Sequence, residues 1–182
     1  AARRVPAYKD FLKKHKIAHE KIRTIKDFQG VVPPVDKDSY LRRYPLDDLC
    51  WDGALASTQM ISVSSGATGD PFFWPRGLML ELETSYLFEL LLREYFGRRG
   101  SRVLFVNCWA LGLWVGGTIT LNSMMRVAQK RNDVLLVTPG NVLEEVLRVL
   151  PKLGPYFDEI ILAAYPPFLK DVLDEGRHRG VN

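Results

Sequence analysis

A group of hydroxyl and glycine residues stands out between Ser62 and Arg76, where the sequence reads SVSSGATGDPFFWPR. Six consecutive small residues form its centre: Ser64, Ser65, Gly66, Ala67, Thr68 and Gly69. Glycines allow backbone N–H groups to turn toward an anion, and hydroxyl groups add hydrogen-bond donors without adding charge. These residue types at this spacing favour the binding of phosphate groups.

This segment differs from the two commonest nucleotide-binding loops. A Walker A loop would need a lysine after its last glycine, and none follows Gly69. The G-x-G-x-x-G spacing of a dinucleotide-binding loop is also absent. Gly66 and Gly69 do match the bare G-x-x-G with which KH domains clamp a nucleic-acid backbone. An ordinary surface loop rich in serine and glycine has the same composition, so these alternatives stay open.

A second candidate site lies at residues 107–117, NCWALGLWVGG. Trp109 and Trp114 stand near Gly112 and two further glycines. Aromatic walls beside small residues can make room for a flat apolar group, which predicts a substrate pocket. A glycine-packed turn with two buried tryptophans would have the same residues.

Arg76 closes the first segment and could supply positive charge close to a phosphate. The alternative is an exposed arginine at the protein surface, since most arginines are exposed.

Apolar periodicity predicts strands that alternate with helices from Met60 onward. The expected strands are residues 60–63, 103–106, 134–137 and 159–163, and the expected helices are residues 78–96, 118–129, one from Asn141 and one from Pro167 to near Gly176. This alternation predicts an α/β fold with a mostly parallel sheet flanked by helices on both faces. Ligands of such sheets bind beyond the carboxyl ends of strands, where residues 64–69 are expected.

Two of these helices allow finer predictions. The apolar residues of the helix at 78–96 that we expect to face the core are Leu82, Tyr86, Leu90 and Leu91. The later helix is expected to begin with Asn141 as its cap and Glu144 at the capping-box position.

The chain before Met60 has a different character. Residues 1–58 are expected to form an N-terminal helical and connector segment, with helices at residues 6–16 and 36–41 and a proline-rich connector at residues 31–36. Residues 59–182 are then expected to form the α/β subdomain that carries the phosphate loop.

Composition and charge limit the class of protein. The 182 residues carry a net charge of +4, which suits an anionic ligand. Cys50 and Cys108 are far apart and lack metal-like spacing, so we expect free thiols, a reducing compartment and a cytoplasmic location. Residues 103–125 have no charge and could span a bilayer by length, but polar residues and glycines interrupt them. A buried strand, a loop and a helix are favoured there, with no membrane span.

Four pieces of the sequence together resemble one enzyme family. Residues 64–71, SSGATGDP, look like the SSGTTG-x-P phosphate loop of AMP-forming adenylating enzymes. Residues 5–8, 32–37 and 164–170 resemble further pieces of the phenylacetate-CoA ligase-like branch, in the family's order and at about its spacing. The resemblance implies the N-terminal part of the large domain of an adenylate-forming enzyme.

The family's reaction implies roles for the two candidate sites. A carboxylate attacks the α-phosphate of ATP to give an acyl-adenylate and pyrophosphate, and a thiol, usually that of coenzyme A, then takes the acyl group. The resemblance assigns Ser64, Ser65, Gly66, Thr68 and Gly69 to the β- and γ-phosphates. We also expect Thr68 to contact Mg²⁺. Ala67 stands where the family usually has threonine, so one hydroxyl donor is missing. Trp109, Gly112 and Trp114 match the turn that contributes to the aryl or acyl pocket.

Other elements of the family have no match in these residues. They are a glycine-rich adenine loop, an aromatic–Gly–x–Thr–Glu element, a ribose-binding aspartate and a catalytic lysine. We therefore expect an N-terminal portion of a larger ligase, inactive alone and without a catalytic residue of its own. The expected partners are a small carboxylic acid, ATP and coenzyme A, with no nucleic acid. The acid, the acceptor thiol and the oligomeric state stay open, and the alternative function is a non-catalytic phosphate- or nucleic-acid-binding α/β module.

Overall fold

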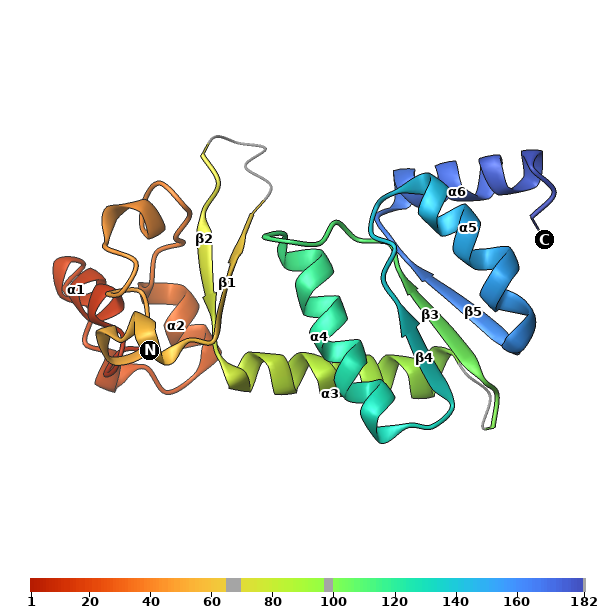
Figure 1. Cartoon of the computed structure of the whole chain (residues 1–182). Helices are drawn as coiled ribbons and strands as arrows, with labels where there is room; N and C mark the ends of the chain where they lie inside the picture. Colours follow the sequence, from red (N-terminus) through yellow and green to blue (C-terminus); the bar gives the residue numbers. More distant parts are fainter. Residues whose placement is uncertain (65–69, 97–99, 182) are drawn as a thin grey trace. The chain divides into compact units, whose positions relative to one another are not determined.

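Three parallel strands form the sheet of the second part of the chain: β3 (Val103–Asn107), β4 (Val134–Val137) and β5 (Glu159–Ala163) (Figure 1). Their order is β4–β3–β5, with Val103 opposite Val134 on one side and opposite Glu159 on the other. β3 is buried along its whole length because a strand pairs with it on each side. The predicted bounds of β4 and β5 are confirmed, and β3 runs one residue further than predicted.

The computed structural model describes residues 1–64, 70–96 and 100–181. The chain divides into two units, Ala1–Met60 and Ile61–Asn182.

Helices cover both faces of the parallel sheet, which confirms the predicted α/β arrangement. Side chains alternate between the two faces of a strand, so β3 contributes to two separate cores. α3 (Leu78–Tyr95) and α4 (Val115–Lys130) pack on one face, and α5 (Leu143–Leu153) and α6 (Pro166–His178) pack on the other (Figure 1). The first core consists of Leu92, Val103, Phe105, Met124, Val127 and Val134. The second consists of Leu104, Val106, Cys108, Val146, Leu147, Phe168 and Val172.

β1 (Met60–Val63) has its predicted bounds but not its predicted place. It pairs with β2 (Phe73–Arg76) in a separate two-stranded sheet, so the expectation that β1 joins the parallel sheet is wrong. The pairing continues past β1, where the Ser64 amide donates to the Phe72 carbonyl oxygen at 3.1 Å. β2 escaped prediction because it is short and contains Pro75, a residue that central strands avoid.

The face of α3 that turns inward also differs from the prediction. Glu81, Ser85 and Leu92 are buried, whereas Leu82, Tyr86 and Leu91 are exposed and Leu90 is half-buried. The first half of α3 packs through polar residues, so apolar periodicity selects the wrong side of the helix.

The start of α5 corrects a second detail. Its N-cap is Val142, with no side-chain capping bond, so the predicted capping box of Asn141 and Glu144 is wrong. The Glu144 carboxylate instead accepts hydrogen bonds from the guanidinium of Arg179, beyond α6. This long-range ion pair competes with the local cap.

The unit Ala1–Met60 holds α1 (Pro6–Lys14) and α2 (Ile25–Val31), of which only α1 was predicted. Its core consists of Ala7, Phe11, Leu12 and Tyr40. The helix predicted at residues 36–41 is wrong, because residues 37–40 form turns and a 3₁₀ helix follows at Leu41–Arg43. Among the described residues, the other 3₁₀ helices are His19–Lys21, Trp51–Gly53, Leu55–Ser57 and Gly154–Tyr156.

The uncharged stretch at residues 103–125 folds as β3, a turn and the first part of α4, as predicted. Across residues 1–64, 70–96 and 100–181, no helix combines the length and the apolar character that crossing a membrane requires.

Candidate functional site

At the carboxyl ends of the neighbouring strands β3 and β5, the chain turns toward opposite faces of the sheet. The chain leaves β3 toward α4 on one face of the sheet and leaves the adjacent β5 toward α6 on the opposite face (Figure 1). In open α/β sheets, ligands bind beside such a point of divergence. This edge of the sheet is therefore the candidate site, and it includes the turn at residues 107–114.

Asn107, the last residue of β3, holds this turn in place. Its side chain is fully buried and donates from Nδ2 to the Gly117 carbonyl oxygen at 3.1 Å. Its Oδ1 accepts from the Trp109 amide at 3.3 Å, and its carbonyl oxygen accepts from the Gly140 amide at 3.2 Å. Asn107 thus links the turns that follow β3 and β4. The sequence signal for this role was an asparagine directly after the apolar run at residues 103–106.

The turn also packs closely against the start of α4. A Cβ atom on Gly117 would lie 1.9 Å from the Ala110 carbonyl oxygen, so only glycine fits there. A Cβ atom on Gly116 would lie 3.2 Å from Cε3 of Trp109, which places that indole against the first turn of the helix.

The three predicted pocket residues differ in exposure. Trp109 is half-buried, whereas Trp114 is 44% exposed. The alternative of a turn with two buried tryptophans is therefore wrong. Gly112 is exposed and has a φ of +74°, in the left-handed region that favours glycine. The turn thus offers one aromatic face to solvent beside a sharp glycine bend.

The structure brings the start of the first candidate segment next to the second. The Val63 amide, at the end of β1, donates to the Leu113 carbonyl oxygen at 2.8 Å, and Val63 forms a parallel bridge with Trp114. Ser64 follows directly, and its Oγ accepts from the Phe72 amide at 3.0 Å. The other predicted phosphate-binding residues, Ser65, Gly66, Ala67, Thr68 and Gly69, lie outside the described residues, as does the predicted Mg²⁺ contact of Thr68.

Arg76 is not the surface arginine that the sequence allowed. It is 2% exposed and forms a buried ion pair with Glu81 through Nε, at 2.8 Å, and Nη2. Its Nη1 donates to Ser62 Oγ at 2.7 Å and to Thr118 Oγ1 at 2.9 Å. Glu81 Oε2 accepts from Asn122 Nδ2 at 3.1 Å.

We call these five residues, Ser62, Arg76, Glu81, Thr118 and Asn122, the Arg76 network. A charged residue inside the apolar run LMLEL was the one sequence signal for it. Because Glu81 matches the charge of Arg76, the guanidinium is a structural cation in this unit.

Both cysteines are free, as predicted, and both are buried. Burial raises the pKa of the Cys108 thiol to about 11 and also raises that of Cys50. Neither thiol is therefore an activated nucleophile at neutral pH. Among the described residues, no group of three or more His, Cys, Asp or Glu side chains could hold a metal ion.

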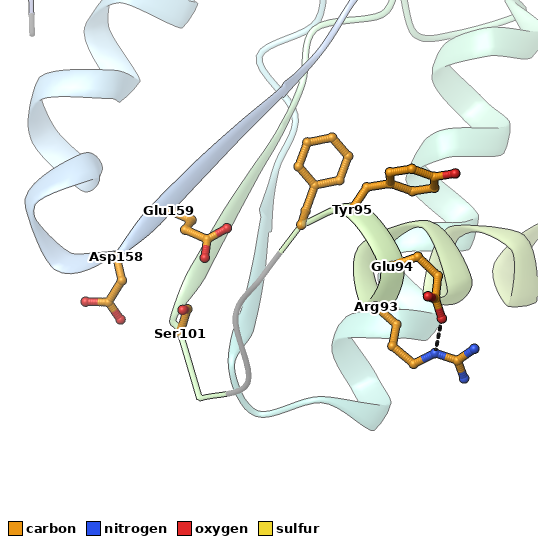
Figure 2. A pocket seen from close by; sticks show the side chains of 7 residues that line it. Arg93, Glu94, Tyr95, Ser101, Asp158 and Glu159 are labelled. Carbon is orange, nitrogen blue, oxygen red and sulfur yellow. Dashed lines mark hydrogen bonds and ion pairs between the residues drawn. The ribbon is translucent and has the colours of Figure 1, made fainter.

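A groove of about 650 Å³ opens at the opposite, amino end of the sheet (Figure 2). It is lined by Arg93, Glu94, Tyr95, Phe96, Ser101, Asp158 and Glu159. Glu94 pairs with Arg93 at 2.8 Å, and Asp158 pairs with Arg102 at 3.1 Å, so these carboxylates already have cationic partners. The groove lies away from the edge where α/β sheets bind ligands.

No protein-family model matches the chain, and no curated protein is significantly similar to it.

Proposed function

We propose that this chain supplies the phosphate-binding loop and part of the acid-binding site of an ATP-dependent, AMP-forming carboxylate–thiol ligase. The observation that carries the proposal is the bond between Val63 and Leu113. It joins the strand end that bears Ser64 to the turn that bears Trp114.

The reaction requires this adjacency. The carboxylate oxygen of the acid must meet the α-phosphorus of ATP while pyrophosphate leaves from the other side. Binding energy lowers the barrier when the two reactants are held in line within a few ångströms. With Ser64 beside the aromatic turn at the carboxyl edge of the sheet, this chain would meet that requirement.

The roles of the individual residues follow from the resemblance and from their chemistry. Ser64, Ser65, Gly66, Thr68 and Gly69 would bind the β- and γ-phosphates through hydroxyl and backbone donors, which stabilise the charge of the departing pyrophosphate. Mg²⁺ would share that charge, with Thr68 as its contact. Ala67 adds only its backbone amide.

The acid would lie against Trp114. Its exposed indole and the bend at Gly112 would accept a flat aryl or acyl group. The carbonyl of the adenylate would then react with the thiol of coenzyme A, with AMP as the leaving group. We propose no catalytic acid or base among these residues.

Isothermal titration of the chain with Mg·ATP and with pyrophosphate tests the proposal. We expect Thr68→Ala to raise the dissociation constant about tenfold, since a hydrogen bond to a charged phosphate is lost. The matched control is Ser57→Ala, which removes an exposed hydroxyl of a 3₁₀ helix and should leave the affinity unchanged.

Two outcomes would contradict the proposal. A wild-type chain that binds neither ligand would remove its basis. Binding to single-stranded RNA that weakens steeply with salt, without affinity for ATP, would favour the nucleic-acid module instead.

A further inference from the structure

The Arg76 network connects the two halves of the candidate site through hydrogen bonds of Arg76 to Ser62 and Thr118. Its residues come from β1, β2, α3 and α4. A buried ion pair is weak evidence for stability, because the desolvation of both charges offsets their attraction. Buried ion pairs can instead specify position, and the contacts of Arg76 indicate which position is specified.

A single guanidinium nitrogen holds both segments. Nη1 of Arg76 donates to Ser62, two residues before Ser64, at 2.7 Å, and to Thr118, in the first turn of α4, at 2.9 Å. The Ser62 and Thr118 hydroxyl oxygens are 3.4 Å apart.

The Thr118 hydroxyl extends this contact to the aromatic turn. It accepts from Arg76 and donates to the Trp114 carbonyl oxygen at 3.0 Å. The neighbouring Leu113 carbonyl oxygen accepts from the Val63 amide at 2.8 Å. Two successive carbonyls of the turn are therefore held, that of Leu113 by β1 and that of Trp114 by Thr118, whose amide and hydroxyl both donate to it. The same hydroxyl accepts from Arg76, so it connects the turn to the guanidinium.

We propose that Arg76 is a positioning residue, which acts through Ser62 and Thr118 to hold the strand end that bears Ser64 against the turn that bears Trp114. This inference rests on the proposed function, which assigns Ser64 to the polyphosphate and Trp114 to the acid. Loss of the Thr118 hydroxyl removes the link that Arg76 makes between the turn and the strand, leaves the Val63–Leu113 bond in place, and weakens ligand binding in a protein that remains folded.

Two variants of Thr118 distinguish a role in positioning the turn from a role in the stability of the fold. Thr118→Val keeps the shape of the side chain and removes the hydroxyl, whereas Thr118→Ser keeps the hydroxyl and removes the methyl group. Ser123→Ala is the matched control, because Ser123 is buried on the same helix and its hydroxyl has no hydrogen-bond partner in the described part of the chain.

Affinity for Mg·ATP is measured by calorimetry at a temperature where circular dichroism shows all proteins folded. We expect Thr118→Val to raise the dissociation constant about fivefold or more, a typical size for coupling between neighbouring sites. Thr118→Ser and Ser123→Ala should bind as the wild type does. Should Thr118→Val fail to fold, Ser62→Ala removes the other acceptor of Arg76 and is expected to weaken binding in the same way.

The outcomes distinguish this inference from the proposed function. If Thr68→Ala weakens binding of Mg·ATP and Thr118→Val only lowers the melting temperature, Arg76 has a structural role alone and the positioning inference is wrong. If the wild type does not bind Mg·ATP, the proposed function fails and the inference fails with it.

Discussion

The amide nitrogen of Val63 and the carbonyl oxygen of Leu113 are 2.8 Å apart, and this bond joins two segments that are distant in the sequence. It ends β1 against the turn that precedes α4. Ser64, the first residue of the hydroxyl-rich segment, thereby lies in one candidate site with the tryptophan turn.

Substitution of Gly117 should disrupt that turn. In Gly117→Ala the new Cβ would lie 1.9 Å from the Ala110 carbonyl oxygen, and backbone must move to relieve the clash. We expect a loss of about 3 kcal/mol in the free energy of unfolding, measured with urea. Gly116→Ala is the control, because its Cβ would meet only the Trp109 side chain at 3.2 Å. Equal effects of the two substitutions would show that the close approach is unimportant.

Removal of one member of the buried ion pair should lower the free energy of unfolding more than removal of both members. Arg76→Met leaves the Glu81 carboxylate buried without its cation, and we expect it to destabilise the unit by about 3–5 kcal/mol. Arg76→Met combined with Glu81→Leu should recover most of that loss, since apolar residues of similar volume replace the pair. Urea denaturation of the single and double variants measures the difference. A double variant no more stable than Arg76→Met would contradict this account.

The pair of Arg102 and Asp158 should make stability depend on acid pH. Hydrogen bonds from the Arg102 side chain and then from its backbone amide lower the pKa of Asp158 below its ordinary value of 3.8. The stabilisation is therefore present above that value and is lost as the pH falls through the lowered pKa of the folded state. Asp158→Asn should be less stable than the wild type at pH 7, and the difference should shrink below about pH 4.

Thermal unfolding across that pH range measures this effect. Arg102→Met removes the other partner and should show the same convergence with the wild type in acid. A difference that stays constant with pH would assign the loss to packing instead of charge.

Cys108 should resist alkylation in the folded protein. Its side chain is 1% exposed and burial raises its pKa to about 11, so little thiolate forms near neutral pH. Iodoacetamide labelling of Cys50→Ala, in which Cys108 is the one remaining thiol, should be slow in buffer and rapid in urea. Rapid labelling in buffer would show that the end of β3 opens readily.

The strands and helices of the sheet were predictable because their signals are local. Apolar runs such as residues 134–137 and 159–163 gave the bounds of β4 and β5, and the alternation with helices gave the α/β class. The bounds of these strands depend mainly on residues that are close together in the sequence. The prediction of the inward face of α3 was wrong because that face depends on a distant residue. Asn122 on α4 donates to Glu81, which is therefore buried.

By itself, the sequence determined which residue types could bind phosphate and an apolar acid, and which stretches would be strands or helices. The tertiary structure alone decided that β1 pairs with β2, that Arg76 is buried, and that Ser64 lies beside the turn of Trp114. These outcomes depend on hydrogen bonds between residues far apart in the chain, such as Arg76 and Thr118, and no periodicity in one segment reports its distant partner.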